Sequence, residues 1–218
     1  MPAGTTRTLL DGTAGKIEVA ANLPLNAHAV AVIAHPHPLF GGTMDNKVVT
    51  TLGKAFLDAG IATFRFNFRG VAGTEGKHDE GRGEVDDMVL VIEHARATLS
   101  HVPLHLAGFS FGGSVATFAS ERVDFKQLVL VAPGFRRFTE HGMGEAPDPN
   151  DPKFGSPGRH GPHNTVVIHG DLDETVPLSD SISWATPREV PVAIVPGGEH
   201  FFHRKLHVLR EITSRFIR

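Results

Sequence analysis

Apolar and polar residues alternate in blocks along the chain, and these blocks predict strands separated by helices. The strand candidates are short apolar runs, at residues 16–21, 29–34, 61–66, 102–107, 127–131, 165–169 and 191–195. The helix candidates are segments in which apolar residues recur at helical spacing, over residues 48–59, 85–99, 113–119 and 202–216. We expect Asp45 to cap the first of these helices and Gly60 to end it. Strands that alternate with helices favour a mostly parallel sheet with helices on both faces.

One long stretch, residues 135–164, does not follow this pattern. It is rich in proline, glycine and histidine, contains few apolar residues and shows no sustained period. We expect a long surface loop, because the stretch cannot bury enough apolar area to fold alone. A small substrate lid is the alternative. The whole chain, residues 1–218, is expected to form a single domain.

Composition excludes several classes of protein. The formal net charge is −3 and there is no basic block, so nucleic acid is not an expected partner. The chain has no cysteine, which excludes a disulfide framework, a thiolate nucleophile and cysteine ligands for zinc. No segment resembles a signal peptide or approaches the length of a membrane span, so we expect a soluble cytoplasmic protein without a membrane partner. The sequence gives no signal for an oligomeric state.

A serine flanked by glycines is the most informative motif. Ser110 lies two residues after Gly108 and two before Gly112, directly after a strand candidate and before a run of small residues. The G-x-S-x-G pattern is typical of a nucleophile elbow, a turn so tight that side chains at the flanking positions would collide. In a chain with 24 glycines the pattern alone can arise by chance, but its place between a strand and a helix favours a nucleophilic serine.

Residues that could activate this serine follow two later strands. An activated serine needs a base, and the base needs a group that orients it. The strand at 165–169 leads into Asp171 and Asp173, and the strand at 191–195 leads into His200 and His203. The order serine, acid, base is the one expected for a nucleophile elbow of this kind. The spacing alone leaves both pairs open.

Five sequence blocks together share their pattern with one known family. They are A-H-P-H-P-L-F-G-G-T-M-D-N-K-V-V from Ala34, F-N-F-R-G-V from Phe66, G-F-S-F-G-G from Gly108, H-G-D-L-D-E-T-V-P from His169 and G-G-E-H-F-F-H from Gly197. With them the chain resembles the α/β-hydrolases, and more narrowly the small dienelactone-hydrolase-like serine hydrolases. The resemblance covers nearly the whole chain and implies a mostly parallel central sheet, helices on both faces and no substantial cap domain.

The resemblance also assigns roles within the triad. The family's acid is the fifth residue of the H-G-x-x-D block, which is Asp173, and its base is the first histidine of H-F-F, which is His200. Asp171 then becomes a turn residue and His203 a residue in the first turn of a helix. No cofactor is implied.

Acyl transfer also needs two backbone N–H donors aimed at the developing oxyanion. One comes from the residue after the serine, Phe111. The other comes from an earlier strand-to-helix loop, where Pro36 and Pro38 have no N–H to donate. His37 and the residues from Leu39 onward remain, and position and resemblance together favour the His37 backbone.

The histidines of the H-P-H-P segment have a second interpretation, because two histidines two positions apart can bind zinc. The block shows no following Asp-His pair and no carboxylate before Asp45, so we expect no metal. The His35 side chain is expected to be structural. Arg69, Asp79 and Glu84 are expected to fix a loop by hydrogen bonds, with substrate binding by Arg69 as the alternative.

These observations predict a serine hydrolase that cleaves small carboxylic esters through an acyl-enzyme, with Ser110 as nucleophile, His200 as base and Asp173 as orienting acid. The pocket is expected to be apolar, lined by residues next to these motifs: Leu39, Phe40, Phe109 and Phe201. Thioesterase or peptidase activity with the same triad is the nearest alternative. A non-catalytic binding protein with the same fold and a metal-dependent hydrolase are rivals from other classes.

Overall fold

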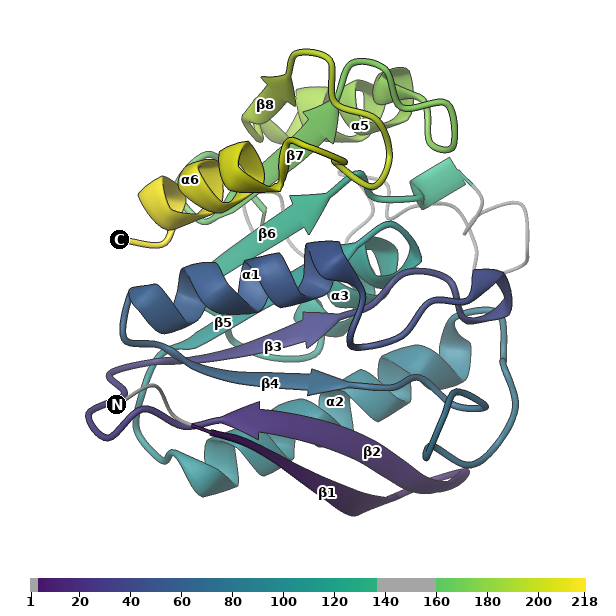
Figure 1. Ribbon diagram of the computed structural model, residues 1–218, viewed down its shortest axis with the longest axis vertical. Helices are drawn as coiled ribbons and strands as arrows, with labels where there is room; N and C mark the ends of the chain where they lie inside the picture. The colour runs from purple at the N-terminus through teal and green to yellow at the C-terminus, as the bar shows by residue number, and fades with distance from the viewer. Residues whose placement is uncertain (1–3, 137–159) are drawn as a thin grey trace.

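The protein is built around one mixed β-sheet, seen here in a computed structural model that describes residues 4–136 and 160–218 (Figure 1). The strands are β1 (Thr5–Gly12), β2 (Gly15–Asn22), β3 (Val30–Ala34), β4 (Ala62–Phe66), β5 (Leu104–Phe109), β6 (Gln127–Val131), β7 (Thr165–Gly170) and β8 (Val192–Val195). The helices are α1 (Lys47–Asp58), α2 (Arg82–Thr98), α3 (Phe111–Ser120), α5 (Leu178–Ala185) and α6 (Leu206–Phe216), with short 3₁₀ turns η1 (Pro38–Phe40) and η3 (Thr186–Arg188).

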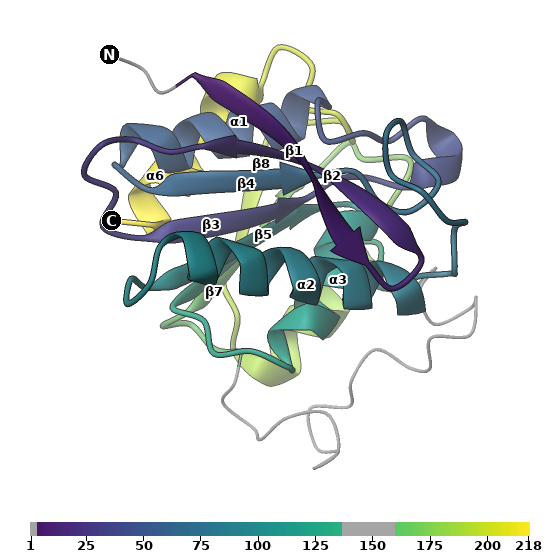
Figure 2. The same ribbon diagram turned by 90° about the horizontal axis from the view of Figure 1, so that it is seen from below.

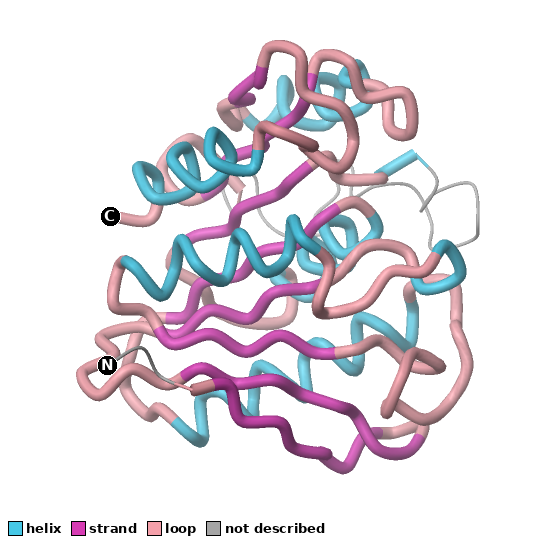
Figure 3. Tube along the Cα trace, in the orientation of Figure 1, coloured by secondary structure: helices cyan, strands magenta, loops and turns pink. Residues whose placement is uncertain are grey.

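The strand order is β1-β2-β4-β3-β5-β6-β7-β8. From β4 to β8 every neighbouring pair is parallel, whereas β1 and β2 form an antiparallel hairpin that joins the sheet through β4. The carboxyl ends of the parallel strands therefore meet at one edge of the sheet, where the connecting loops gather (Figure 3). This is the edge at which open α/β sheets bind ligands. The predicted fold class, mostly parallel and covered on both faces, is confirmed.

Side chains of one strand alternate between two apolar layers. In β3, Val30 and Val32 pack into a cluster with α2 and α3, and Ala31 and Ile33 pack into a second cluster with α1 and α6. Figure 2 shows α1 on one side of the sheet and α2 and α3 on the other. A strand buried on both faces must be apolar throughout, which explains why these strands appear as unbroken apolar runs.

Several local expectations differ from the structure. Helix α1 is capped by Asn46, whose side chain accepts the Val48 N–H (2.8 Å), and not by Asp45. Asp45 instead forms ion pairs with Arg7 of β1 (2.6 Å) and Arg65 of β4 (3.1 Å). Strand β5 lies two residues later than predicted and runs up to Phe109, directly before Ser110.

Of the predicted irregular stretch 135–164, residues 137–159 lie outside the described residues, and with them the lid alternative. Over the ranges that are described, none of the helices has the length and apolar character that crossing a membrane requires.

Candidate active site

Ser110 occupies a strained turn between β5 and α3. Its backbone has φ 56° and ψ −120°, a conformation that side-chain-bearing residues rarely adopt. A Cβ at Gly108 would lie 2.1 Å from the Gly112 carbonyl oxygen, and a Cβ at Gly112 would lie 2.4 Å from the His35 carbonyl oxygen. Both distances are too short for any side chain, so the two glycines are what permits this turn.

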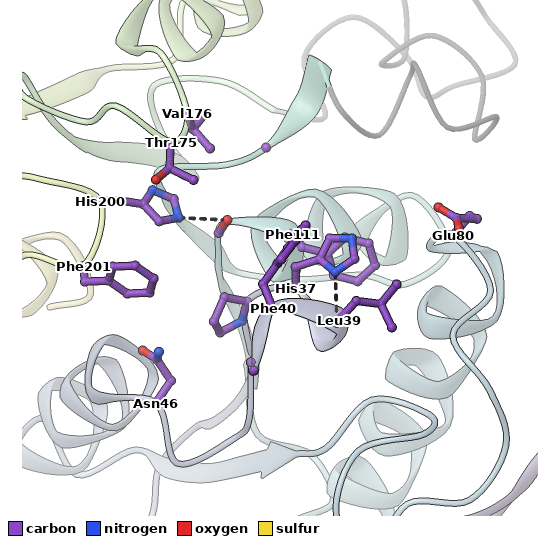
Figure 4. Close-up of a pocket in the computed structure, with 15 residues that line it drawn as sticks. His37, Leu39, Phe40, Asn46, Glu80, Phe111, Thr175, Val176, His200 and Phe201 are labelled. Carbon is purple, nitrogen blue, oxygen red and sulfur yellow. Dashed lines mark hydrogen bonds between the residues drawn. The ribbon is translucent and has the colours of Figure 1, made fainter.

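The loops after β7 and β8 bring an acid and an imidazole to Ser110. His200 Nε2 lies 3.1 Å from Ser110 Oγ (Figure 4). His200 Nδ1 lies 2.7 Å from Asp173 Oδ2. Because the carboxylate accepts the Nδ1–H, Nε2 is the ring nitrogen that faces the serine hydroxyl as acceptor. The structure thus places the three residues in one hydrogen-bonded row.

The two alternative residues lie elsewhere. Asp171 Oδ1 accepts the Gly197 N–H (2.6 Å) and joins the loops after β7 and β8. The exposed His203 pairs with Glu199 (2.6 Å). Neither contacts Ser110.

Asp173 is held as a carboxylate in a buried position. Its Oδ1 accepts the N–H groups of Thr175 (2.9 Å) and Val176 (2.8 Å), and His169 Nε2 lies 3.3 Å from its Oδ2. Burial opposes ionisation, but the hydrogen bonds from His169, His200 and the Val176 backbone outweigh it and hold the pKa of Asp173 well below its usual range. The carboxylate is therefore available to His200 across the neutral pH range.

His169 is a second histidine at Asp173, and the sequence interpretation gave it no role. Its Nε2 is 3.0 Å from the Val176 carbonyl oxygen and its Nδ1 is 2.7 Å from Ser181 Oγ. The carbonyl can only accept, so Nε2 carries the proton and Nδ1 accepts from the Ser181 hydroxyl. The residue is the last but one of β7 and lies four positions before Asp173, and that spacing is the signal that could have identified it.

In the loop after β3, several backbone N–H groups donate to acceptors of the same loop. Phe40 and Gly42 donate to the His37 carbonyl (3.2 and 3.1 Å), and Gly41 donates to the Pro38 carbonyl (3.2 Å). The Leu39 N–H donates to His37 Nδ1 (3.2 Å). The residues from Leu39 to Gly42 thus use their N–H groups within the loop, and the role of the His37 N–H in an oxyanion hole stays a prediction. The His37 ring packs against the Phe111 ring, with centroids 4.8 Å apart.

His35 is a structural residue in this arrangement. Its Nδ1 lies 2.6 Å from the Pro36 carbonyl oxygen, and its Nε2 accepts the Phe68 N–H (2.9 Å), so both ring nitrogens are engaged. Burial lowers the pKa of His35 to about 4. Within residues 4–136 and 160–218, no group of three or more histidine, aspartate or glutamate side chains is placed to hold a metal ion.

A cavity of about 470 Å³ opens above Ser110. Its lining residues are Pro36, His37, Leu39, Phe40, Gly41, Gly42, Asn46, Glu80, Ser110, Phe111, Gly134, Thr175, Val176, His200 and Phe201. Three of the four predicted pocket residues, Leu39, Phe40 and Phe201, are among them.

The fourth pocket prediction, Phe109, is wrong. This residue is fully buried in β5, and its side chain packs in the layer of α1 and α6. Its ring packs against the His200 ring, with centroids 4.9 Å apart. Sequence reasoning missed Asn46 and Glu80, because both reach the pocket from loops whose course depends on distant contacts.

The expected loop-fixing role of Arg69, Asp79 and Glu84 is confirmed. Arg69 makes a bidentate ion pair with the buried Asp87 (2.9 and 2.8 Å), and it does not line the pocket. Asp79 accepts the Gly83 N–H (3.0 Å). The alternative role of Arg69 in substrate binding is therefore wrong.

Comparison with known proteins shows which family and which fold this chain resembles. The model of the serine aminopeptidase S33 family matches residues 27–147. An α/β serine hydrolase homologue from Coxiella burnetii is 35% identical, with 98% of this chain and 97% of that one covered and a TM-score of 0.82. An α/β serine hydrolase without a lid from Xanthomonas campestris is 33% identical, with 100% and 95% covered and a TM-score of 0.85.

The dienelactone hydrolase from Anabaena variabilis shares the fold at 15% identity, with 100% of this chain and 98% of that one covered and a TM-score of 0.77. The described residues of the present chain include no cap domain over the site.

Proposed function

This chain belongs to the serine aminopeptidase S33 family of α/β serine hydrolases. We propose that it hydrolyses small carboxylic esters through an acyl-enzyme formed on Ser110. The observation that carries the proposal is the continuous hydrogen-bonded row from Asp173 through His200 to Ser110, at the floor of an open pocket.

Acylation follows from this row. Ser110 Oγ attacks the ester carbonyl carbon while His200 Nε2 takes the hydroxyl proton, and Asp173 stabilises the imidazolium that forms. The carbonyl oxygen becomes an oxyanion that accepts hydrogen bonds from the Phe111 and His37 N–H groups. His200 then gives its proton to the alcohol oxygen as the ester C–O bond breaks, and the alcohol leaves.

Deacylation repeats the same steps with water. His200 Nε2 takes a proton from a water molecule that attacks the acyl carbon, and the second tetrahedral intermediate collapses as His200 returns the proton to Ser110 Oγ. The products are a carboxylic acid and the free enzyme. The chemistry is complete without a cofactor.

The pocket supports small, partly apolar substrates. Leu39, Phe40 and Phe201 expose 69%, 75% and 42% of their surface, and they stand around the cavity mouth. An acyl or aryl group that covers these side chains would remove apolar area from water, which favours binding. Thioesters carry the same electrophilic carbon and are the next candidates.

The first test is labelling with a fluorophosphonate probe, which reacts with activated serines. We expect the wild-type protein to be labelled, and Ser110→Ala and His200→Ala to remain unlabelled while folded by circular dichroism. p-Nitrophenyl esters, matched thioesters and amino-acid p-nitroanilides then separate esterase, thioesterase and peptidase activity. A folded wild-type protein that is not labelled would favour a non-catalytic binding protein and overturn the proposal.

A further inference from the structure

Glu80 is the one residue with a formal charge at neutral pH among the described residues that line the pocket, histidines being counted as neutral. No lysine or arginine lines the cavity within the described ranges. From this we propose, on the basis of the esterase function above, that the enzyme prefers esters whose acyl portion carries a positive charge, such as an ammonium group, and that Glu80 determines this preference.

The carboxylate is not used to build the helix that follows it. At the start of α2 the Asp79 and Gly81 N–H groups both donate to the Glu84 carboxylate (3.0 and 2.9 Å), and Asp79 in turn accepts the Gly83 N–H (3.0 Å). Glu84 and Asp79 therefore satisfy the backbone donors at this end of the helix. The His78 ring lies between the two carboxylates, with its Nε2 3.7 Å from Glu80 Oε2 and its Nδ1 2.8 Å from Glu84 Oε1.

The position of Glu80 is fixed by its neighbours. Its backbone is left-handed (φ 51°), which a side-chain-bearing residue rarely adopts. Such a conformation persists where surrounding contacts determine it. Here the residues on both sides of Glu80, Asp79 and Gly81, donate their N–H groups to the fully buried Glu84, so the carboxylate is presented from a rigid turn.

A row of packed rings lies between the Glu80 carboxylate and Ser110. His78 packs against the His37 ring (4.9 Å between centroids) and the Phe111 ring (5.5 Å), and His37 also packs against Phe40 (4.9 Å). The faces of two phenylalanine rings that line the pocket, Phe40 and Phe111, attract cations, and the Glu80 carboxylate adds an opposite charge. The wall of the pocket near Glu80 therefore has the chemistry of a cation-binding subsite.

The placement of His200 indicates which part of the substrate reaches Glu80. Because His200 must protonate the departing alcohol, the alcohol portion lies on the His200 side of Ser110. In Figure 4, Glu80 lies on the opposite side, beyond Phe111 and Leu39. The acyl portion is thus the one that extends toward the carboxylate.

The test compares p-nitrophenyl esters that share one leaving group and differ only at the far end of the acyl chain. 6-Aminohexanoate ends in an ammonium group, heptanoate ends in a methyl group of similar size, and the monoester of adipic acid ends in a carboxylate. Homologues with acyl chains two carbons shorter and longer are included, so that a mismatch in length does not hide the effect. The quantity compared is kcat/KM.

We expect wild type to prefer the ammonium ester over the methyl ester by roughly 3–10-fold, since Glu80 is 45% exposed and partly screened by water. Glu80→Gln should bring that ratio close to one, Glu80→Asp should restore part of it, and Glu80→Lys should favour the carboxylate ester. Glu93→Gln is the matched control, because Glu93 is an exposed residue of α2 outside the pocket, and it should leave the ratio unchanged.

The outcomes separate the two proposals. Suppose that the wild-type protein hydrolyses the heptanoate ester and that Ser110→Ala does not. If Glu80→Gln then leaves the ratio of ammonium to methyl ester unchanged, the esterase function stands and the role of Glu80 is overturned. If no ester of the series is hydrolysed and Ser110 is not labelled by the fluorophosphonate, both proposals fail.

Discussion

Two histidines at the carboxyl edge of the sheet, His35 after β3 and His200 after β8, are buried to a similar degree and use both ring nitrogens. They differ in what they contact. His35 contacts two backbone groups, which can neither gain nor lose a proton, so it holds two loops together. His200 contacts a carboxylate and a hydroxyl, so the same ring can move a proton between them. Burial and hydrogen-bond count do not distinguish the two residues, whereas the chemistry of the partners does.

The largest expected effect is on the His200 side of this comparison. His200→Gln should lower kcat/KM for a p-nitrophenyl ester by about 10³-fold or more, because no group remains to take the Ser110 proton. The free energy of unfolding, from urea denaturation, should change by less than about 1 kcal/mol. His203→Gln is the control, since His203 is exposed and pairs with Glu199, and it should stay near wild type. Retention of a tenth of wild-type activity by His200→Gln would remove it from the mechanism.

A somewhat smaller effect is expected when the partner of His200 is changed. Asp173→Asn should lower kcat by about 10²–10³-fold, because an amide no longer fixes the Nδ1–H tautomer or stabilises the imidazolium. Asp171→Asn is the matched control, because the Asn oxygen can still accept the Gly197 N–H. Stopped-flow measurement of the acylation burst shows which step is slowed. Equal losses in both variants would contradict the assignment of the acid to Asp173.

Replacing His35 should lower the stability of the protein without removing the reactivity of Ser110. His35→Leu leaves the buried Phe68 N–H without its acceptor and the Pro36 carbonyl without its donor, and we expect the free energy of unfolding to fall by about 2–4 kcal/mol. The folded fraction should still react with a fluorophosphonate at Ser110. A variant that unfolds at the wild-type urea concentration would show that His35 is not a structural support.

The sequence predicted those parts of the fold that bury apolar side chains on both faces. It did not predict β1 (Thr5–Gly12), because this edge strand pairs only with β2 and most of its residues are exposed, so no apolar run marks it. Helix α5 (Leu178–Ala185) was missed for a related reason: it is short, and Ser181, Trp184 and Ala185 are its only buried residues.

The pocket shows the same limit at the level of single residues. Phe109 is next to Ser110 in sequence, but it belongs to β5 and its side chain points into the layer of α1 and α6, so adjacency misled the prediction. Glu80 lies in a glycine-rich stretch with no period, and its place at the pocket depends on distant contacts of that stretch, such as the packing of His78 against His37 and Phe111. Motifs that carry their own local geometry could be predicted, whereas residues positioned by distant contacts could not.

A third buried histidine extends the comparison and gives the smallest predicted effect. His105 in β5 packs against the Phe56 ring, and both of its ring nitrogens are buried without a hydrogen-bond partner in the described structure. Burial lowers the pKa of His105 to about 4. Between pH 6.5 and pH 4 the unfolded chain therefore binds a proton that the folded chain does not, and stability falls as the pH falls through this window.

His105→Leu removes this proton while keeping an apolar side chain of similar size, so the variant should lose less stability than wild type on acidification. From pH 7 to pH 5 we expect the difference in lost free energy of unfolding to be about 2 kcal/mol, measured by urea denaturation at closely spaced pH values. His35 is present in both proteins and contributes equally to the pH dependence of their stability. The difference between the two proteins therefore reports on His105 alone. Parallel curves for the two proteins would mean that His105 titrates equally in the folded and unfolded states. A histidine without partners, unlike His35 and His200, would then contribute nothing to the pH response of this fold.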